Sequence, residues 1–179
     1  MTKRTQRLIT GLLLVVATAL VQRYSKKINN ADNLIISKAP VINARNFASS
    51  TAAVVRVVDG DTIELDTGEK VRYIGVNAPE SVDPRKPVEC FGKEASEYNK
   101  SLVEGKAVGL VGDVGDKDKY GRLLRYVYLN DGTFVNLKLV QDGYASVMTV
   151  QPNVAYQKEF VAAQSKAREN KVGLWNACK

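Results

Sequence analysis

Residues 54–80, VVRVVDGDTIELDTGEKVRYIGVNAPE, contain the pattern that decides how this chain folds. The stretch opens with β-branched valines, which favour strands, and these lead into the strong turn signal Asp59-Gly60. Apolar and polar side chains then alternate over residues 63–66, and Thr67-Gly68-Glu69 marks a second turn. A third run, rich in apolar residues, follows at residues 71–76. The stretch therefore predicts a meander of three short strands joined by two turns.

Four polar side chains lie near the predicted strand ends, in a setting otherwise rich in valine and isoleucine: Asp61, Arg72, Asn77 and Glu80. A third strand needs apolar residues on its core face, but nothing in a strand requires an arginine. A purely structural explanation stays open, since Asp61 could simply form the turn and Glu80 could be an exposed loop residue. The grouping of the four nevertheless points to a functional site.

The rest of the chain alternates between predicted helices and strands within one domain. Apolar residues at near-helical spacing predict helices at residues 92–104, 135–141 and 155–170. Apolar runs between turn signals predict strands at residues 107–111 and 123–129, and an extended segment at residues 144–150. A chain of 179 residues with 45% apolar content is large enough for one domain with a core, but hardly for two. The elements predict an α+β fold.

The positive charge of the chain lies in its first 50 residues. The whole chain has a net charge of +7, and residues 1–50 carry all of it, with eight Lys or Arg against one Asp. The remainder is balanced, so any affinity for nucleic acid must come from local clusters of charge.

The first 23 residues are predicted to be a signal peptide or an N-terminal membrane anchor. Basic residues precede an apolar run at residues 8–21, whose helix would span about 21 Å, against ~30 Å for the hydrocarbon core of a bilayer. Residues 24–50 are predicted to be a linker and residues 51–179 the folded domain. The protein is thus expected to be exported, either secreted or held at the membrane through residues 8–21.

The composition limits the chemistry that the chain can perform. It contains no histidine, which excludes histidine bases and Ser-His-Asp triads, and two cysteines, too few for a four-cysteine zinc site. Catalysis must rely on carboxylates, arginines, lysines and hard metal ions. In an exported protein, Cys90 and Cys178 predict a disulfide, whereas two buried free thiols are the alternative in the cytosol.

Three motifs in a fixed order resemble the staphylococcal-type nucleases (thermonucleases). They are DGDT at residues 59–62, R-x6-P-E from Arg72 to Glu80, and DKYGR at residues 118–122, and the similarity extends to Gly173-Leu174-Trp175. DGDT alone is a common turn, whereas the ordered combination is specific. The resemblance implies a five-stranded Greek-key β-barrel of the oligonucleotide-binding kind, flanked by about three helices.

The resemblance also implies a calcium site made of oxygen ligands. It assigns Asp61, Asn77 and the backbone carbonyl of Ala78 to the metal, in keeping with the preference of Ca²⁺ for oxygen. The family has carboxylates at both side-chain positions, and this chain has an amide at Asn77. One negative charge fewer predicts a weaker hold on the ion.

The catalytic roles implied by the resemblance fall to two arginines and a glutamate. Arg72 and Arg122 would clamp the phosphate, because planar guanidinium groups bind phosphate oxygens bidentately. Glu80 would activate or orient the attacking water. Lys119 and Tyr120 match positions that bind a terminal phosphate. For Arg122 a salt bridge with a nearby aspartate is the structural alternative.

One departure from the family concerns base stacking. Where a relative has two tyrosines, this chain has Met148 and Val150. Stacking contributes ~1–3 kcal/mol per base, so affinity or base preference is expected to be lower.

The sequence thus predicts an exported or membrane-tethered, calcium-dependent nuclease that acts on DNA and RNA, expected as a monomer. The alternative is a non-catalytic barrel that binds nucleic acid or protein. The presence of Asp61, Arg72, Glu80 and Arg122 favours the enzyme.

Overall fold

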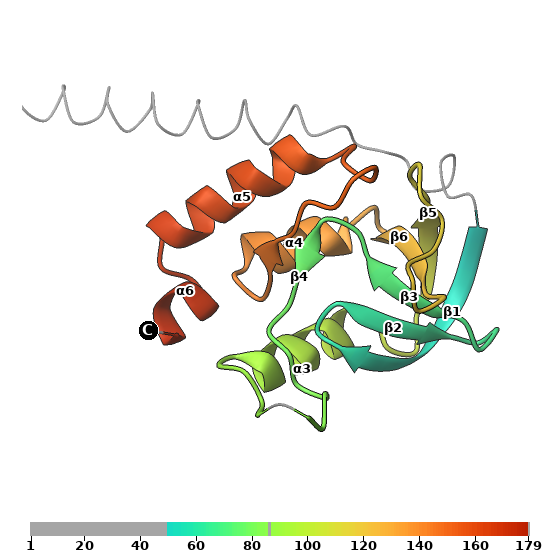
Figure 1. Cartoon of the computed structure of the whole chain (residues 1–179), viewed down its shortest axis with the longest axis horizontal. Coiled ribbons are helices and arrows are strands. Elements are labelled where there is room, and N and C mark those ends of the chain that lie inside the picture. Colours follow the sequence, from blue (N-terminus) through green and yellow to red (C-terminus); the bar gives the residue numbers. More distant parts are fainter. Residues whose placement is uncertain (1–49, 86, 179) are drawn as a thin grey trace, which may run out of the picture. The chain divides into compact units, whose positions relative to one another are not determined.

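Five strands close into a barrel in the order β1-β2-β3-β6-β5 (Figure 1). The computed structural model describes residues 50–85 and 87–178, so the predicted leader lies outside the described residues. The barrel strands are β1 (Ser50–Asp59), β2 (Thr62–Leu65), β3 (Lys70–Tyr73), β5 (Ala107–Val111) and β6 (Leu123–Leu129). β1 pairs with β5 through residues 50–53 and with β2 through residues 54–59. With the helices, this barrel confirms the predicted α+β fold.

The predicted meander forms, and its register brings the polar residues together. β1 passes into β2 through Gly60, where a Cβ atom would lie 2.5 Å from the Cβ of Ala78, so the turn has no room for a side chain. β2 pairs with β3 in a register that sets Thr62 opposite Arg72. The arginine therefore lies across from the turn that carries Asp61.

The third strand is shorter than the sequence predicts. β3 ends at Tyr73, and the chain turns at Gly75, whose φ of +83° is favourable only for glycine. A Cβ at Gly75 would lie 2.3 Å from the ring of Phe160, a clash that also excludes other residues. The prediction of one continuous strand over residues 71–76 is wrong because this turn is imposed by a helix distant in sequence.

After the turn, the chain enters a second, two-stranded sheet. β4 (Val76–Asn77) pairs with β7 (Ser146–Val147), which is the only strand within the predicted extended segment 144–150. This pairing directs the chain back towards the first turn, so that Ala78 N–H donates to Asp61 Oδ2 at 2.8 Å.

The helices are α3 (Gly92–Val103), α4 (Val135–Gln141), α5 (Gln157–Glu169) and α6 (Leu174–Ala177). Of these, α3 packs against β1, α4 packs against β6, and α5 packs along α4 (Figure 1). The first three agree with the predicted helices to within two residues at each end. The sequence did not predict α6, because four residues are too few for a helical period to show. Within residues 50–85 and 87–178, no helix has the length and apolar character needed to cross a membrane.

Two buried asparagines attach helices to the strand ends near Arg72. Asn136 on α4 donates to the carbonyl of Ile74 at 2.9 Å and accepts from Val127 N–H at 2.9 Å. Asn99 on α3 accepts from the hydroxyl of Tyr73 at 3.0 Å and donates to the carbonyl of Asp59 at 3.2 Å. Because buried polar groups are costly unless hydrogen-bonded, these complete networks fix the loops.

The C-terminal end is tied to the segment before α3. Cys90 and Cys178 form a disulfide bond, and the two residues are 88 positions apart in the sequence. The backbone before α6 lies against a turn, since Leu174 N–H donates to the carbonyl of Gly143 at 2.8 Å. Together these contacts fix α6 to the rest of the domain.

Candidate active site

An ion pair between Arg72 and Asp61 lies at the centre of the candidate site. Arg72 Nη2 is 3.0 Å from Asp61 Oδ2, and the two side chains are only 13% and 7% exposed. The second oxygen of Asp61, Oδ1, accepts from the hydroxyl of Thr62 at 3.0 Å. The predicted metal ligand and the predicted clamp residue are therefore direct partners.

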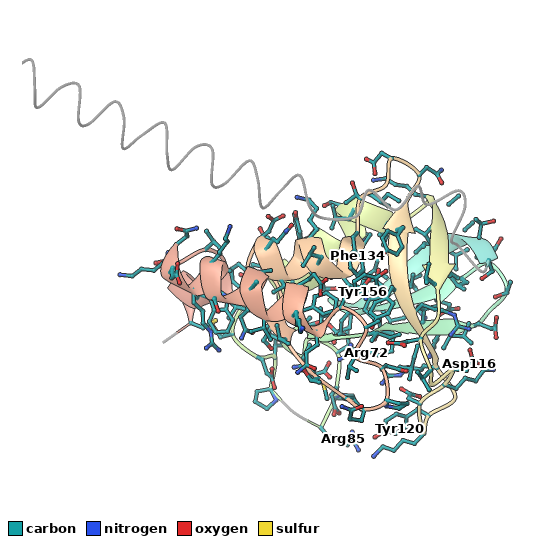
Figure 2. All side chains as sticks on the ribbon, turned by 90° about the horizontal axis from the view of Figure 1, so that it is seen from above. Arg72, Arg85, Asp116, Tyr120, Phe134 and Tyr156 are labelled. Atoms are coloured by element: carbon teal, nitrogen blue, oxygen red, sulfur yellow. A yellow bond between two sulfur atoms is a disulfide. The ribbon has the colours of Figure 1, made fainter. Side chains whose placement is uncertain are left out.

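The guanidinium of Arg72 is held by the backbone as well. Its Nη1 donates to the carbonyls of Tyr73 at 2.8 Å and Val76 at 2.7 Å. Its Nη2 also donates to Asn77 Oδ1 at 3.2 Å, and the sulfur of Met148 lies 3.9 Å away. The turn after β3 thus curls around the arginine. Figure 2 shows Arg72 well inside the outline of the domain.

Arg72 and Arg122 are close enough to influence each other electrostatically. Burial lowers the pKa of Arg72 from its ordinary value, Asp61 opposes this shift, and the positive charge of Arg122 adds to it. An arginine keeps its charge at neutral pH even so. Two guanidinium groups that repel each other form a site where an anion such as phosphate relieves the repulsion.

Arg122 is oriented by Asp118 and keeps part of its guanidinium free. Its Nε donates to Asp118 Oδ2 at 2.7 Å, and its backbone N–H donates to Asp118 Oδ1 at 3.0 Å. Although burial favours the neutral acid, the hydrogen bonds from Arg122 and Tyr120 lower the pKa of Asp118. The salt bridge foreseen as a structural alternative does form. Within the described ranges, however, neither η nitrogen of Arg122 donates to a protein acceptor.

Arg125, which lies on β6, differs from Arg122 in the partners of its guanidinium. Its Nη2 pairs with Asp116 Oδ1 at 2.6 Å, and its Nη1 donates to the carbonyls of Leu124 and Asp116 at 2.7 and 3.2 Å. Both of its η nitrogens therefore have protein partners, in contrast to those of Arg122.

Glu80 is an ionised carboxylate that its own loop holds in place. Its Oε1 accepts from the N–H groups of Val82 at 2.8 Å and Asp83 at 3.0 Å. These bonds, that from Val82 above all, lower the pKa of Glu80. Its backbone N–H donates to Glu89 Oε2 at 3.0 Å, which closes the loop. A low pKa keeps Glu80 charged but makes it a modest proton acceptor, better suited to orienting water than to deprotonating it unaided.

Asp59 is a third carboxylate of the site, and the sequence analysis missed it. Burial, together with the charges of Asp61 and Glu80, raises the pKa of Asp59 to about 6, against the opposing effect of a 2.6 Å hydrogen bond from Ser81 Oγ. Its place as the first residue of the DGDT motif is the signal that could have identified it. The charges of Asp61 and Glu80 thus disfavour the ionised form of Asp59, an effect that a nearby cation would relieve.

The predicted calcium ligands Asp61, Asn77 and Ala78 lie close together in the structure, although the side-chain oxygens of Asp61 and Asn77 have protein partners. Asp61 accepts from Ala78 N–H, and the exposed Asn77 turns its Oδ1 towards Arg72. Across the described residues, no three acidic, histidine or cysteine side chains form a metal-binding group. A cation would rely on Asp61, on the Ala78 carbonyl, on the Asn77 amide and on water. An all-oxygen donor set beside excess negative charge fits Ca²⁺.

Lys119 and Tyr120 form the exposed rim of the site. Tyr120 is 72% exposed, with Lys119 Nζ 5.0 Å and Arg122 Cζ 5.5 Å from its ring centroid. Arg85, on the loop that follows Glu80, lies at the same side of the domain as Tyr120 (Figure 2). An exposed ring between cations suits a nucleotide, because it provides both a stacking face and positive charge.

Comparison with known proteins identifies the family. The family described as "Staphylococcal nuclease homologue" matches residues 70–177. A thermonuclease of Staphylococcus hyicus is 37% identical over 176 residues, which cover 96% of this chain and 99% of the relative. A thermonuclease of Staphylococcus intermedius is 36% identical over 173 residues, covering 95% and 98%. Endonuclease YncB of Bacillus subtilis (strain 168) is 41% identical over 126 residues, covering 68% and 59%.

The family match includes Arg72, Glu80 and the turn at residues 118–122, and both thermonucleases align over nearly their whole length. The resemblance first noticed in three motifs therefore extends through the domain, and the chain belongs to the staphylococcal nuclease family.

Proposed function

We propose that this chain, a hydrolase of the staphylococcal nuclease family, cleaves phosphodiester bonds in DNA and RNA with the help of Ca²⁺. One observation carries the proposal: two arginines that repel each other lie in a site with three carboxylates, of which Asp61 and Glu80 disfavour the charge of Asp59. The arginines favour an anion and the carboxylates favour a cation. A phosphodiester together with a metal ion supplies both.

In the proposed reaction, the arginines bind and stabilise the phosphate. The free η nitrogens of Arg122 donate to its oxygens, and Arg72 adds positive charge from a rigid position. Negative charge develops on these oxygens as water attacks, so donors fixed in advance stabilise the transition state more than the ground state. When bound, Ca²⁺ supplies further positive charge near the same oxygens.

Glu80 orients the attacking water in this scheme. Its carboxylate is ionised and immobilised by the N–H groups of Val82 and Asp83. An acceptor held in this way fixes the direction of the water lone pair and takes up a proton as the bond to phosphorus forms. In the manner of the family, the P–O5′ bond breaks, the 5′ oxygen takes up a proton and leaves as a hydroxyl, and the phosphate stays on the 3′ end.

Substrate recognition is proposed to begin at Tyr120 and Lys119. Both are exposed beside Arg122, and they are suited to a terminal phosphate and its nucleoside. Met148 and Val150, 45% and 54% exposed, provide apolar contact where aromatic stacking would be stronger. Single-stranded nucleic acid, whose bases are accessible, is the substrate that fits such a rim.

The protein is proposed to act outside the cytoplasm, as a monomer. The disulfide between Cys90 and Cys178 suits an oxidising compartment, in keeping with the apolar run at residues 8–21. Both a cleaved signal and a retained anchor agree with that run. Fractionation of expressing cells, with the mass of the recovered protein, distinguishes a shortened secreted form from a full-length membrane form.

Digestion of single-stranded DNA by the full chain tests the proposed activity. Fragments should appear with Ca²⁺ and stop appearing when a chelator is added, and RNA should be cut under the same conditions. Full activity in chelator would contradict the role of calcium. Binding of the DNA without cleavage under any of these conditions would favour the alternative, a non-catalytic binding barrel.

A further inference from the structure

Met148 lies against the catalytic arginine and is open to solvent. Its sulfur is 3.9 Å from Arg72 Nη2, and the residue is 45% exposed. Its backbone is fixed directly after β7, since its N–H donates to the carbonyl of Gly75 at 3.0 Å. The thioether thus contacts both the guanidinium and the surrounding water.

Met148 is also an unusually selective target for oxidation. The chain has two methionines, Met1 and Met148, so Met148 is the only one within the described residues. Both cysteines are bonded to each other in the disulfide, which leaves no free thiol there to compete. Within the described residues, a mild peroxide is therefore expected to oxidise one sulfur, that of Met148.

We propose that Met148 is an oxidation site through which peroxides reversibly reduce the activity of this enzyme, an inference that rests on the proposed nuclease function. A sulfur lone pair attacks one peroxide oxygen, the O–O bond breaks and an S–O bond forms. The sulfur loses two electrons to give the sulfoxide, and the departing oxygen takes up a proton as water or an alcohol. Methionine sulfoxide reductases reverse the reaction, with a dithiol that supplies two electrons and two protons and becomes a disulfide while the oxygen leaves as water.

The sulfoxide oxygen acts through Arg72. A thioether is a weak acceptor, whereas a sulfoxide oxygen is polar and accepts strongly. The η N–H groups of Arg72 are all engaged, those of Nη1 by two carbonyls and those of Nη2 by Asp61 and Asn77, and Met148 lies beside Nη2. A sulfoxide oxygen there competes with Asp61 and Asn77 for Nη2, and so disturbs the ion pair that positions the guanidinium. A hydrogen bond to a charged group is worth enough to lower activity roughly tenfold.

The test compares the full chain before and after hydrogen peroxide treatment. Peptide mass spectrometry should show one added oxygen on the peptide that contains Met148. Cleavage of single-stranded DNA with Ca²⁺ should fall roughly tenfold in kcat/KM, with an unchanged melting temperature, and should recover on treatment with the reductases. The Met148→Leu variant, compared with its own untreated rate, should lose no activity in peroxide. Met148→Gln, which places an amide oxygen near Arg72, should show a loss without oxidant.

Each failure identifies which claim is wrong. Full oxidation of Met148 with an unchanged cleavage rate would overturn this inference and leave the proposed function intact. An equal loss in Met148→Leu would overturn it too, because damage would then lie elsewhere. Untreated protein that binds but does not cleave DNA would overturn the proposed function itself, and with it the regulatory role of Met148.

Discussion

Arg72 Nη2 lies 3.0 Å from Asp61 Oδ2, and this ion pair links the proposed phosphate site to the proposed calcium site. Arg72 on β3 pairs with Thr62, the residue after Asp61, and Tyr73 N–H donates to the carbonyl of Asp61, so backbone hydrogen bonds fix the relative position of the two partners. A change in charge at or next to Asp61 is therefore expected to alter the electrostatic environment of the Arg72 guanidinium directly. Arg122, in contrast, is oriented by Asp118 outside this meander. The first two predictions address these two parts separately.

Asn77→Asp is expected to lower the Ca²⁺ concentration needed for half-maximal cleavage. A carboxylate at this position adds one negative charge to a site that otherwise depends on Asp61, an amide and a carbonyl. A calcium titration of the initial rate measures the effect, with Asn77→Ser as the variant that removes the amide without adding charge. An unchanged or higher calcium requirement in Asn77→Asp would remove residue 77 from the metal site.

Asp118→Asn is expected to reduce kcat/KM by roughly 5–50-fold, because the bond between its carboxylate and Arg122 Nε is charge-assisted. The amide can still accept from the backbone of Tyr120, so the turn should persist. Asp116→Asn is the matched control, since its ion pair serves Arg125 instead. If both variants lose the same activity, Asp118 has no special role in orienting Arg122.

Asp59→Asn is expected to stabilise the protein at neutral pH in the presence of chelator. The folded state raises the pKa of Asp59 from 3.8 to about 6, so the folded state binds this proton more tightly than the unfolded state. The free energy of unfolding therefore falls as pH rises from about 4 to 6 and stays reduced above that. Asn has no charge to bury, so the free energy of unfolding of the variant near pH 7 should exceed that of the parent by on the order of 1–2 kcal/mol.

Chemical denaturation at pH 3.5 and pH 7 measures the Asp59 effect. The difference between variant and parent should be near zero at the lower pH and appear at the higher one. A difference of the same size at both values would mean that Asp59 acts through packing and not through its charge.

Reduction of the bond between Cys90 and Cys178 is expected to lower the melting temperature. The bond closes a loop of 88 residues, for which chain entropy predicts up to ~4–5 kcal/mol, and often less in practice. Thermal scans with and without reductant measure the change, and the Cys90→Ser/Cys178→Ser protein is the control that reductant should not affect. An identical melting curve for reduced and oxidised parent would contradict the prediction.

Local patterns predicted most of the fold. Alternation and turn residues located the strands, and helical spacing located α3, α4 and α5, because these signals lie within each segment. The end of β3 could not be predicted in this way. Its cause is the contact between Gly75 and Phe160, which are 85 positions apart in the sequence. The short helix α6 depends likewise on backbone contact with Gly143.

The candidate site was predicted less completely than the fold. The order of the motifs indicated that Asp61, Arg72 and Glu80 lie near one another. It did not indicate which of the nearby aspartates pairs with Arg122 and which with Arg125. The structure pairs Arg122 with Asp118 and Arg125 with Asp116, which no spacing rule distinguishes. The motif DGDT could have pointed to Asp59, but its raised pKa follows from burial and from its charged neighbours, which are properties of the folded state alone.

Cleavage of single-stranded DNA by Glu80→Gln at saturating Ca²⁺ tests the central claim most directly. Glutamine keeps an oxygen for the N–H groups of Val82 and Asp83, so the loop should be retained while the charged acceptor is lost. Glu89→Gln, in the same loop, is the matched control. A water-activating role predicts that kcat falls by ~10²–10⁴-fold in Glu80→Gln with nearly unchanged DNA affinity, and far less in the control. Cleavage by Glu80→Gln at the rate of the parent would contradict the proposed site.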